Sequence, residues 1–136
     1  MAGGVRNAGM ESTVGYLWVA LGGAAGAMAR YGVAQWAGQR WGGVFPWGTL
    51  AVNVTGSLII GLLATLLGRG SDPALRLLLV TGFLGGYTTF SAYSAEALAL
   101  VEARRWDVAA LYISGSVTLG LAACGAGLAL GRSLIR

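Results

Sequence analysis

A polar, glycine-rich stretch interrupts an otherwise apolar sequence where the chain reads GFLGGYTTFSAYSAE, residues 82–96. The stretch combines glycines with hydroxyl side chains, aromatic rings and the carboxylate of Glu96. Phe90, Tyr93 and Ala97 follow one helical face at spacings i, i+3 and i+7. An aromatic ring has an electropositive edge, against which an anion can rest. The pattern therefore predicts either an anion contact made by ring edges or an ordinary aromatic packing contact.

Neutral hydrogen-bond donors recur at helical spacing in two other apolar stretches. Asn53 and Ser57 are one turn apart, and so are Tyr112 and Ser116. An asparagine offers two N–H donors, and serine or tyrosine offers one O–H. Such donors can replace the hydration shell of a hard anion without the fixed charge that would trap it. Hydrogen bonds between helices are the alternative role. The candidate donors are Asn53, Ser57, Ser91, Tyr93, Tyr112 and Ser116.

The elements that must position these side chains are membrane helices. The chain has 136 residues, of which 56% are hydrophobic and 10% are charged, with a mean hydropathy of +0.69. A soluble domain carries about 25% charged residues. Histidine is absent and cysteine occurs once, so no metal-ligand set, disulfide framework or nucleophile–base pair is present. Composition thus excludes most enzymes and favours an integral membrane protein, whose spans must be helices here.

Four spans joined by short connections are expected, with residues 1–13 as a mobile tail and residues 14–136 as one transmembrane channel domain. The connections carry either turn-forming glycine, proline and aspartate or a run of charge, and leave no room for a domain outside the membrane. We therefore predict an all-α membrane protein. The four expected spans are Val14–Ala37, Trp47–Gly68, Pro73–Val101 and Trp106–Leu130.

The third span is too long for one straight membrane helix. Its 29 residues would reach about 43 Å, against a hydrocarbon core of about 30 Å. Gly82, Gly85 and Gly86 offer a break at little cost, and we expect one between residues 82 and 90. Strong tilt or a simple glycine kink is the alternative.

A break in mid-membrane would leave carbonyl oxygens without helical partners. Thr88 and Thr89 can satisfy some of the freed backbone groups. In transporters such unwound carbonyls coordinate cations. Two copies of the chain would bring four or more carbonyls together, which suits a small cation such as Na⁺. Two roles are compatible with Glu96: a functional carboxylate within the membrane, or a carboxylate near the helix end that faces water or a hydroxyl.

The arginines barely specify an orientation in the membrane. Five lie on one side, against three on the other with Arg30 near its edge. This permits either a weakly biased single topology or insertion in both orientations, and the latter allows an antiparallel homodimer. Arg30 can attract anions into a vestibule or extend to lipid headgroups. Small residues such as Gly22, Gly26, Gly56, Gly61, Gly115 and Gly120 favour close helix packing and oligomerisation.

Three motifs on three consecutive spans resemble the Fluc, or CrcB-type, fluoride channels. They are GAMARY (26–31), GTLAVNVTGS (48–57) and GFLGGYTTFSAY (82–93), and the resemblance covers residues 14–131. It implies a dual-topology antiparallel homodimer in the bacterial inner membrane, surrounded by lipid, with two parallel pores. It also implies passive, selective export of fluoride that enters as HF and is trapped as the anion in the more alkaline cytosol.

The resemblance also assigns individual residues. Gly85 and Thr88 match the positions whose backbone carbonyls hold a structural Na⁺ at the dimer centre. Asn53 matches the pore asparagine and Phe90 the first phenylalanine of the aromatic box. The remaining matches are the hydroxyl track of Tyr112 and Ser116, and the vestibule Arg30, with Glu96 and Ser57 as possible pore support.

Three positions depart from the family pattern. The second box position holds Tyr93 in place of phenylalanine, which keeps the ring edge and adds a hydroxyl. Ala92 stands where the family usually has a hydroxyl donor before the second box position, and Gly120 stands where the track often has a hydroxyl. Pairing with a second, dissimilar family member is therefore an alternative to the homodimer.

Two other classes compete with the channel. A proton-coupled small multidrug resistance transporter also uses four short helices in an antiparallel dimer, but it depends on a carboxylate in its first helix. The first span here has no acid, and the only candidate, Glu96, lies in the third. A non-transporting assembly subunit is the second alternative, for which the polar motifs would serve packing alone.

Overall fold

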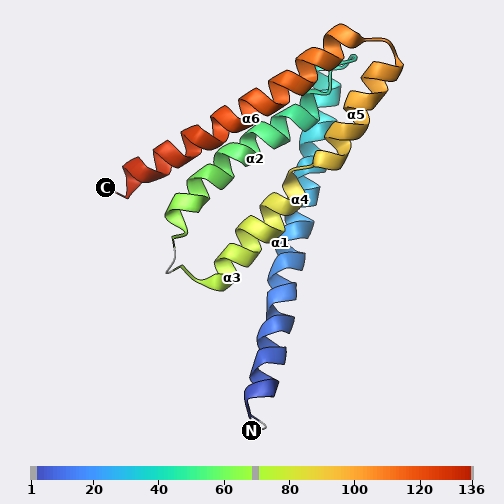
Figure 1. Cartoon of the computed structure of the whole chain (residues 1–136). Coiled ribbons are helices and arrows are strands. Elements are labelled where there is room, and N and C mark those ends of the chain that lie inside the picture. Colours follow the sequence, from blue (N-terminus) through green and yellow to red (C-terminus); the bar gives the residue numbers. More distant parts are fainter. Residues whose placement is uncertain (1–2, 69–70, 136) are drawn as a thin grey trace.

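The computed structural model describes residues 3–68 and 71–135, and all regular secondary structure within these ranges is helical (Figure 1). No strand occurs within these ranges. Two long helices, α1 and α6, bracket the chain, and shorter segments fill the space between them. The elements are α1 (Gly3–Trp41), α2 (Trp47–Leu66), α3 (Pro73–Arg76), the π-helix η1 (Leu77–Leu84), α4 (Gly85–Tyr87), α5 (Phe90–Glu102) and α6 (Trp106–Leu134).

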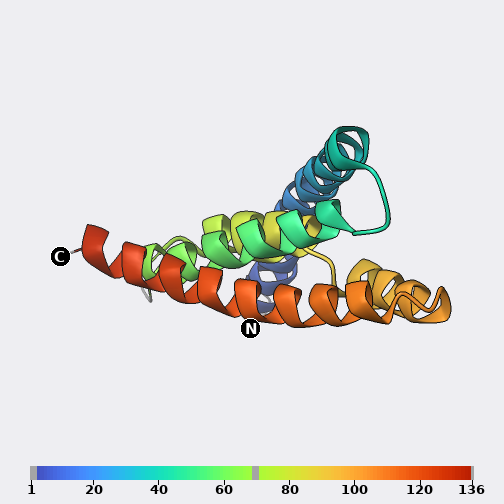
Figure 2. The same ribbon diagram turned by 90° about the horizontal axis from the view of Figure 1, so that it is seen from above.

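The helices form two closely packed pairs. Helix α2 lies along α6, and α1 lies along η1 and α4 (Figure 1). Helix α5 continues past these pairs and packs on the first half of α6 (Figure 2). A small buried cluster holds that end together, and it is formed by Ala97, Leu100, Ala109 and Tyr112.

Glycines allow both pairs to approach at backbone distance. A Cβ added at Gly22 would overlap the Leu78 carbonyl of η1, and one at Gly61 would overlap the Cys124 carbonyl of α6. The expectation of close packing is therefore confirmed at these positions, as it is at Gly26 and Gly56. Gly115 has nothing within 4 Å of an added Cβ, and Gly120 only reaches Ser57.

Helical structure stops between α4 and α5 at two threonines. Thr88 (φ −86°, ψ 158°) and Thr89 (φ −152°, ψ 124°) are both extended, which suits their β-branched side chains. The expectation that Gly82, Gly85 and Gly86 supply the break is wrong, because all three are helical. Gly82 and Gly86 instead provide the close contact with α1.

Among the described residues, two helices are long and apolar enough to cross a membrane by length and composition, namely α2 and α6. The predicted first span lies inside the 39-residue α1, and the predicted third span is divided among α3, η1, α4 and α5. Residues 3–13 of the predicted tail form the start of α1, so their backbone is helical rather than irregular. Their mobility stays a prediction.

Candidate functional site

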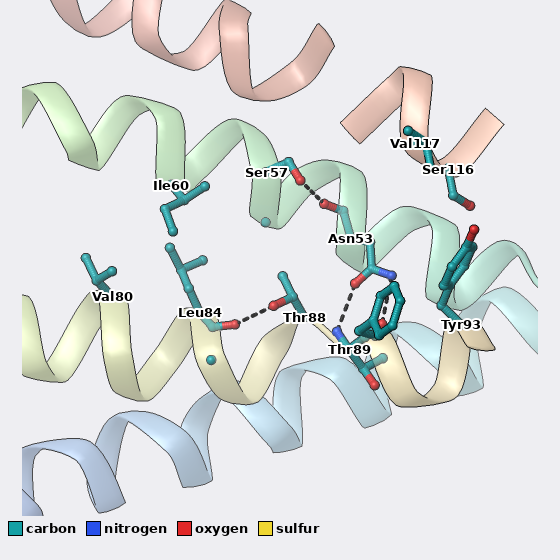
Figure 3. Close-up of a pocket in the computed structure, with 13 residues that line it drawn as sticks. Asn53, Ser57, Ile60, Val80, Leu84, Thr88, Thr89, Tyr93, Ser116 and Val117 are labelled. Atoms are coloured by element: carbon teal, nitrogen blue, oxygen red, sulfur yellow. Dashed lines mark hydrogen bonds between the residues drawn. The ribbon is translucent and has the colours of Figure 1, made fainter. Parts of the chain in front are cut away.

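A cavity of about 430 Å³ lies beside the interruption, between α2, the end of η1 and α6 (Figure 3). It gathers polar groups from four separate segments of the chain. The predicted residues Asn53, Ser57, Phe90, Tyr93 and Ser116 all line it. Its full lining is Asn53, Gly56, Ser57, Ile60, Val80, Leu84, Gly85, Thr88, Thr89, Phe90, Tyr93, Ser116 and Val117.

Asn53 binds the interrupted backbone through both ends of its amide. Its Nδ2 donates to the Thr89 carbonyl at 3.0 Å, and its Oδ1 accepts from the Thr89 N–H at 2.9 Å (Figure 3). The side chain thus satisfies a peptide group that has left the helix, a group whose burial without partners would be costly. One N–H of Asn53 remains for another acceptor.

The two threonines terminate one helix and start the next. Thr88 Oγ1 donates to the Leu84 carbonyl at 2.9 Å, and Thr89 Oγ1 accepts from the Ala92 N–H at 3.1 Å as the N-cap of α5. The prediction that these hydroxyls satisfy freed backbone groups is confirmed for Thr89. The Thr88 hydroxyl instead adds a second hydrogen bond to a carbonyl that already accepts the Thr88 N–H at 3.0 Å. Gly56 packs against the methyl group of Thr88, so α2 holds the interruption from one side.

The same contacts leave two carbonyls without their usual helical donors. The N–H of Thr89 would bond the Gly85 carbonyl in a continuous helix, but it donates to Asn53. The N–H of Ala92 would bond the Thr88 carbonyl, but it donates to the Thr89 hydroxyl. Free carbonyl oxygens are ligands for hard cations, so Gly85 and Thr88 fit a Na⁺ site by their chemistry. No group of three or more acidic, histidine or cysteine ligands exists within the described ranges.

The aromatic residues at the start of α5 face the cavity. Phe90 and Tyr93 lie with ring centroids 5.6 Å apart, as their helical spacing predicts. Phe90 is 78% exposed, although it belongs to a strongly apolar chain. A ring so exposed forms a rim that the chain does not cover by itself.

A second polar cluster is closed within the chain. The Thr49 hydroxyl donates to Glu96 Oε1 at 2.8 Å, and the Tyr112 hydroxyl donates to Glu96 Oε2 at 2.7 Å. Tyr112 is fully buried. This carboxylate also borders a cavity of about 400 Å³ between the end of α1 and the start of α2.

Thr49 is not among the residues predicted from the sequence, although it lies four residues before Asn53 and eight before Ser57 on α2. The spacing of four residues, which puts all three side chains on one helical face, is the signal that could have identified Thr49. The opposing carboxylate comes from α5, so only the packing of α5 beside α2 reveals the pair.

The remaining predicted residues lie away from the first cavity. Ser91 is exposed, and its hydroxyl lies 3.2 Å from that of Thr89. Tyr112 points to Glu96, and Arg30 is half-buried and lines neither cavity. The assignment of these three residues to a pore or vestibule stays a prediction.

Comparison with known proteins identifies the family. A family profile described as "CrcB-like protein, Camphor Resistance (CrcB)" matches residues 17–128. A protein of Rhizobium johnstonii named "Fluoride-specific ion channel FluC" is 53% identical over 118 residues, covering 85% of this chain and 94% of the relative. Proteins of the same name from Acidobacterium capsulatum and Sorangium cellulosum are 47% and 41% identical, each over 88% of this chain and over 98% and 96% of their own lengths. The resemblance drawn from the three motifs is confirmed, and the chain belongs to the CrcB-like family.

Proposed function

We propose that this chain is a fluoride-selective channel that lets cytoplasmic fluoride leave passively, down its electrochemical gradient. The observation that carries the proposal is the cavity at the interruption, whose polar lining consists of uncharged donors beside the exposed ring of Phe90 and the half-buried ring of Tyr93. The relatives named as fluoride-specific channels point to the same ion. We propose no catalytic reaction for it.

Uncharged donors suit conduction of a small, strongly hydrated anion. Asn53 keeps one N–H, and Tyr93 and Ser116 bring hydroxyls, so donors can replace water around the ion as it passes. Fixed positive charge is absent from the lining, which keeps binding weak enough for release. The ring edges of Phe90 and Tyr93 add electropositive contact.

A second copy of the chain completes the site in this proposal. Phe90 and Gly85 border the cavity and are exposed, so its open side has no cover from the same chain. An antiparallel homodimer would cover that side in the bacterial inner membrane. Each copy would then supply half of the lining, and the third predicted span would act as a transmembrane helix broken at Thr88 and Thr89.

A structural Na⁺ at the dimer centre is part of the same proposal. It is supported by the free carbonyls of Gly85 and Thr88, whose helical donors are directed elsewhere. Bound there, the ion would neutralise the partial negative charge of the carbonyls and join the two copies. We expect Na⁺ to raise the thermal midpoint of the detergent-solubilised dimer more than K⁺ does; equal midpoints would contradict the sodium site.

The proposed pore assigns the other predicted residues to its approaches. Arg30 would attract anions to the vestibule, Ser91 would extend the hydroxyl path, and Glu96 and Ser57 would support it. Tyr112 would act through its ring beside Tyr93, because its hydroxyl already donates to Glu96. The multidrug transporter is not favoured, because Glu96, the candidate acid, lies in the third expected span rather than the first and accepts hydrogen bonds from two hydroxyls.

The direct test is anion efflux from liposomes that contain the purified protein. We expect rapid fluoride efflux, measured with a fluoride electrode, and no chloride efflux from matched vesicles. Protein-free vesicles are the control. Vesicles that hold fluoride under a steep gradient would overturn the proposal, and uptake of a cationic drug driven by a pH gradient would favour the transporter.

Dual topology has its own test. In a Cys124→Ser background, Arg105→Cys places one thiol in the exposed connection before α6. We expect a membrane-impermeant reagent to label about half of the protein in sealed vesicles and all of it after lysis. Labelling that is complete or absent before lysis would indicate a single orientation.

A further inference from the structure

One buried hydroxyl in the cavity has no hydrogen-bond partner. The Oγ of Ser116 is the only buried side-chain polar atom without one within the described residues. Serine on a helix often donates to the carbonyl four residues earlier, as Ser114 does to Ala110. Ser116 makes no such bond, although burial without a partner is unfavourable. Its hydroxyl is therefore free for a group that enters the cavity.

The Tyr93 hydroxyl points toward Ser116 across the same cavity (Figure 3). Its ring is fixed between Phe90, at a centroid distance of 5.6 Å, and Tyr112, at 5.3 Å. The two hydroxyls do not bond each other, since Ser116 Oγ has no partner. Two donors thus face one another with no acceptor between them.

The other polar side chains at this position are already committed. Ser57 donates to the Asn53 carbonyl at 2.7 Å, and Thr88 donates to Leu84. The amide of Asn53 holds Thr89. Tyr93 and Ser116 are the hydroxyls in the lining that make no hydrogen bond within the described part of the chain.

We propose that the Tyr93 and Ser116 hydroxyls form a two-donor subsite that binds a single small anion between them. The inference rests on the proposed function and deepens it, because it makes Tyr93 a specificity-determining residue through its hydroxyl as well as its ring edge. Hydrogen bonds from a hydroxyl to an anion are short and strong. Two rigidly placed donors therefore favour the smallest halide over larger ones, whose optimal contacts are longer.

The test is a double-mutant cycle on the reconstituted full-length protein. Tyr93→Phe and Ser116→Ala are made singly and together, and the fluoride concentration that half-saturates efflux is measured for each. We expect each single change to raise that concentration about tenfold, since a hydrogen bond to an ion contributes about a factor of ten or more in affinity. In the double variant, the half-saturating concentration should rise by clearly less than the product of the two single increases. The reason is that an ion that has already lost one donor no longer bridges the two hydroxyls.

Tyr16→Phe is the matched control, because it removes a hydroxyl from an exposed ring on α1 outside both cavities. We expect its half-saturation to equal that of the unchanged protein. The subsite would be overturned if Tyr93→Phe left the half-saturating fluoride concentration unchanged, or if the increase in the double variant equalled the product of the two single increases. Either result would still be compatible with a conducting channel. An unchanged protein that passes no fluoride would overturn both proposals.

Discussion

Two polar regions of this molecule differ in whether their side chains find hydrogen-bond partners within the chain. In the cluster of Thr49, Glu96 and Tyr112, each carboxylate oxygen of Glu96 accepts a hydrogen bond from a hydroxyl group, and Tyr112 is fully buried. In the cavity beside the interruption, the Ser116 hydroxyl has no partner and the Phe90 ring is exposed. The first region is complete within one chain, whereas the second needs something from outside. This difference separates groups that stabilise the fold from groups left free for an ion or a second copy.

The largest effect is expected from Asn53→Asp. The change removes the donor to the Thr89 carbonyl and places a negative charge in the path proposed for an anion. We expect fluoride efflux to fall about a hundredfold, since a lost buried hydrogen bond and charge repulsion act together. Gln35→Glu on α1 makes the same chemical change outside both cavities and should retain efflux. Undiminished efflux in the Asn53 variant would remove this residue from the pore.

Removing one donor from the closed cluster should reduce stability. Tyr112→Phe leaves Glu96 Oε2 without its hydroxyl, so we expect the free energy of unfolding in detergent to fall by about 1–3 kcal/mol. Tyr93→Phe is the matched change in the open region, where no hydrogen bond is lost. If both variants unfold at the same midpoint, the distinction between closed and open regions fails.

Gly56→Ala tests how closely α2 must hold the interruption. The added methyl group would overlap the side chain of Thr88, and overpacking of this kind costs about 1–3 kcal/mol. We expect a lower unfolding midpoint together with slower fluoride efflux. Gly115→Ala adds a methyl where nothing lies within 4 Å and should not lower the midpoint.

The smallest effect is expected from Ser116→Ala on stability. This hydroxyl makes no hydrogen bond, so its removal should change the free energy of unfolding by less than about 1 kcal/mol and need not be destabilising. A loss as large as that of Tyr112→Phe would show that Ser116 already has a structural partner.

Much of the site was predictable because helical spacing places residues on common faces. Asn53 and Ser57 on α2, with Phe90 and Tyr93 on α5, reach one cavity as their periodicity indicated. The conformational freedom of glycine pointed to a break at the glycines, but the interruption lies at Thr88 and Thr89. Gly82 and Gly86 are required for backbone contact with α1, and that contact holds them in the helix.

The class of protein, the main helical segments and the family follow from composition, apolar length and motif order, which are properties of the linear chain. Which polar groups are satisfied depends on how the helices pack. Glu96 meets Thr49 because α5 packs beside α2, and the Asn53 amide meets Thr89 because the chain leaves its helix at that point. A hydrogen bond requires two groups within about 3 Å, and for partners 36 or 47 residues apart that proximity exists only after the helices have packed.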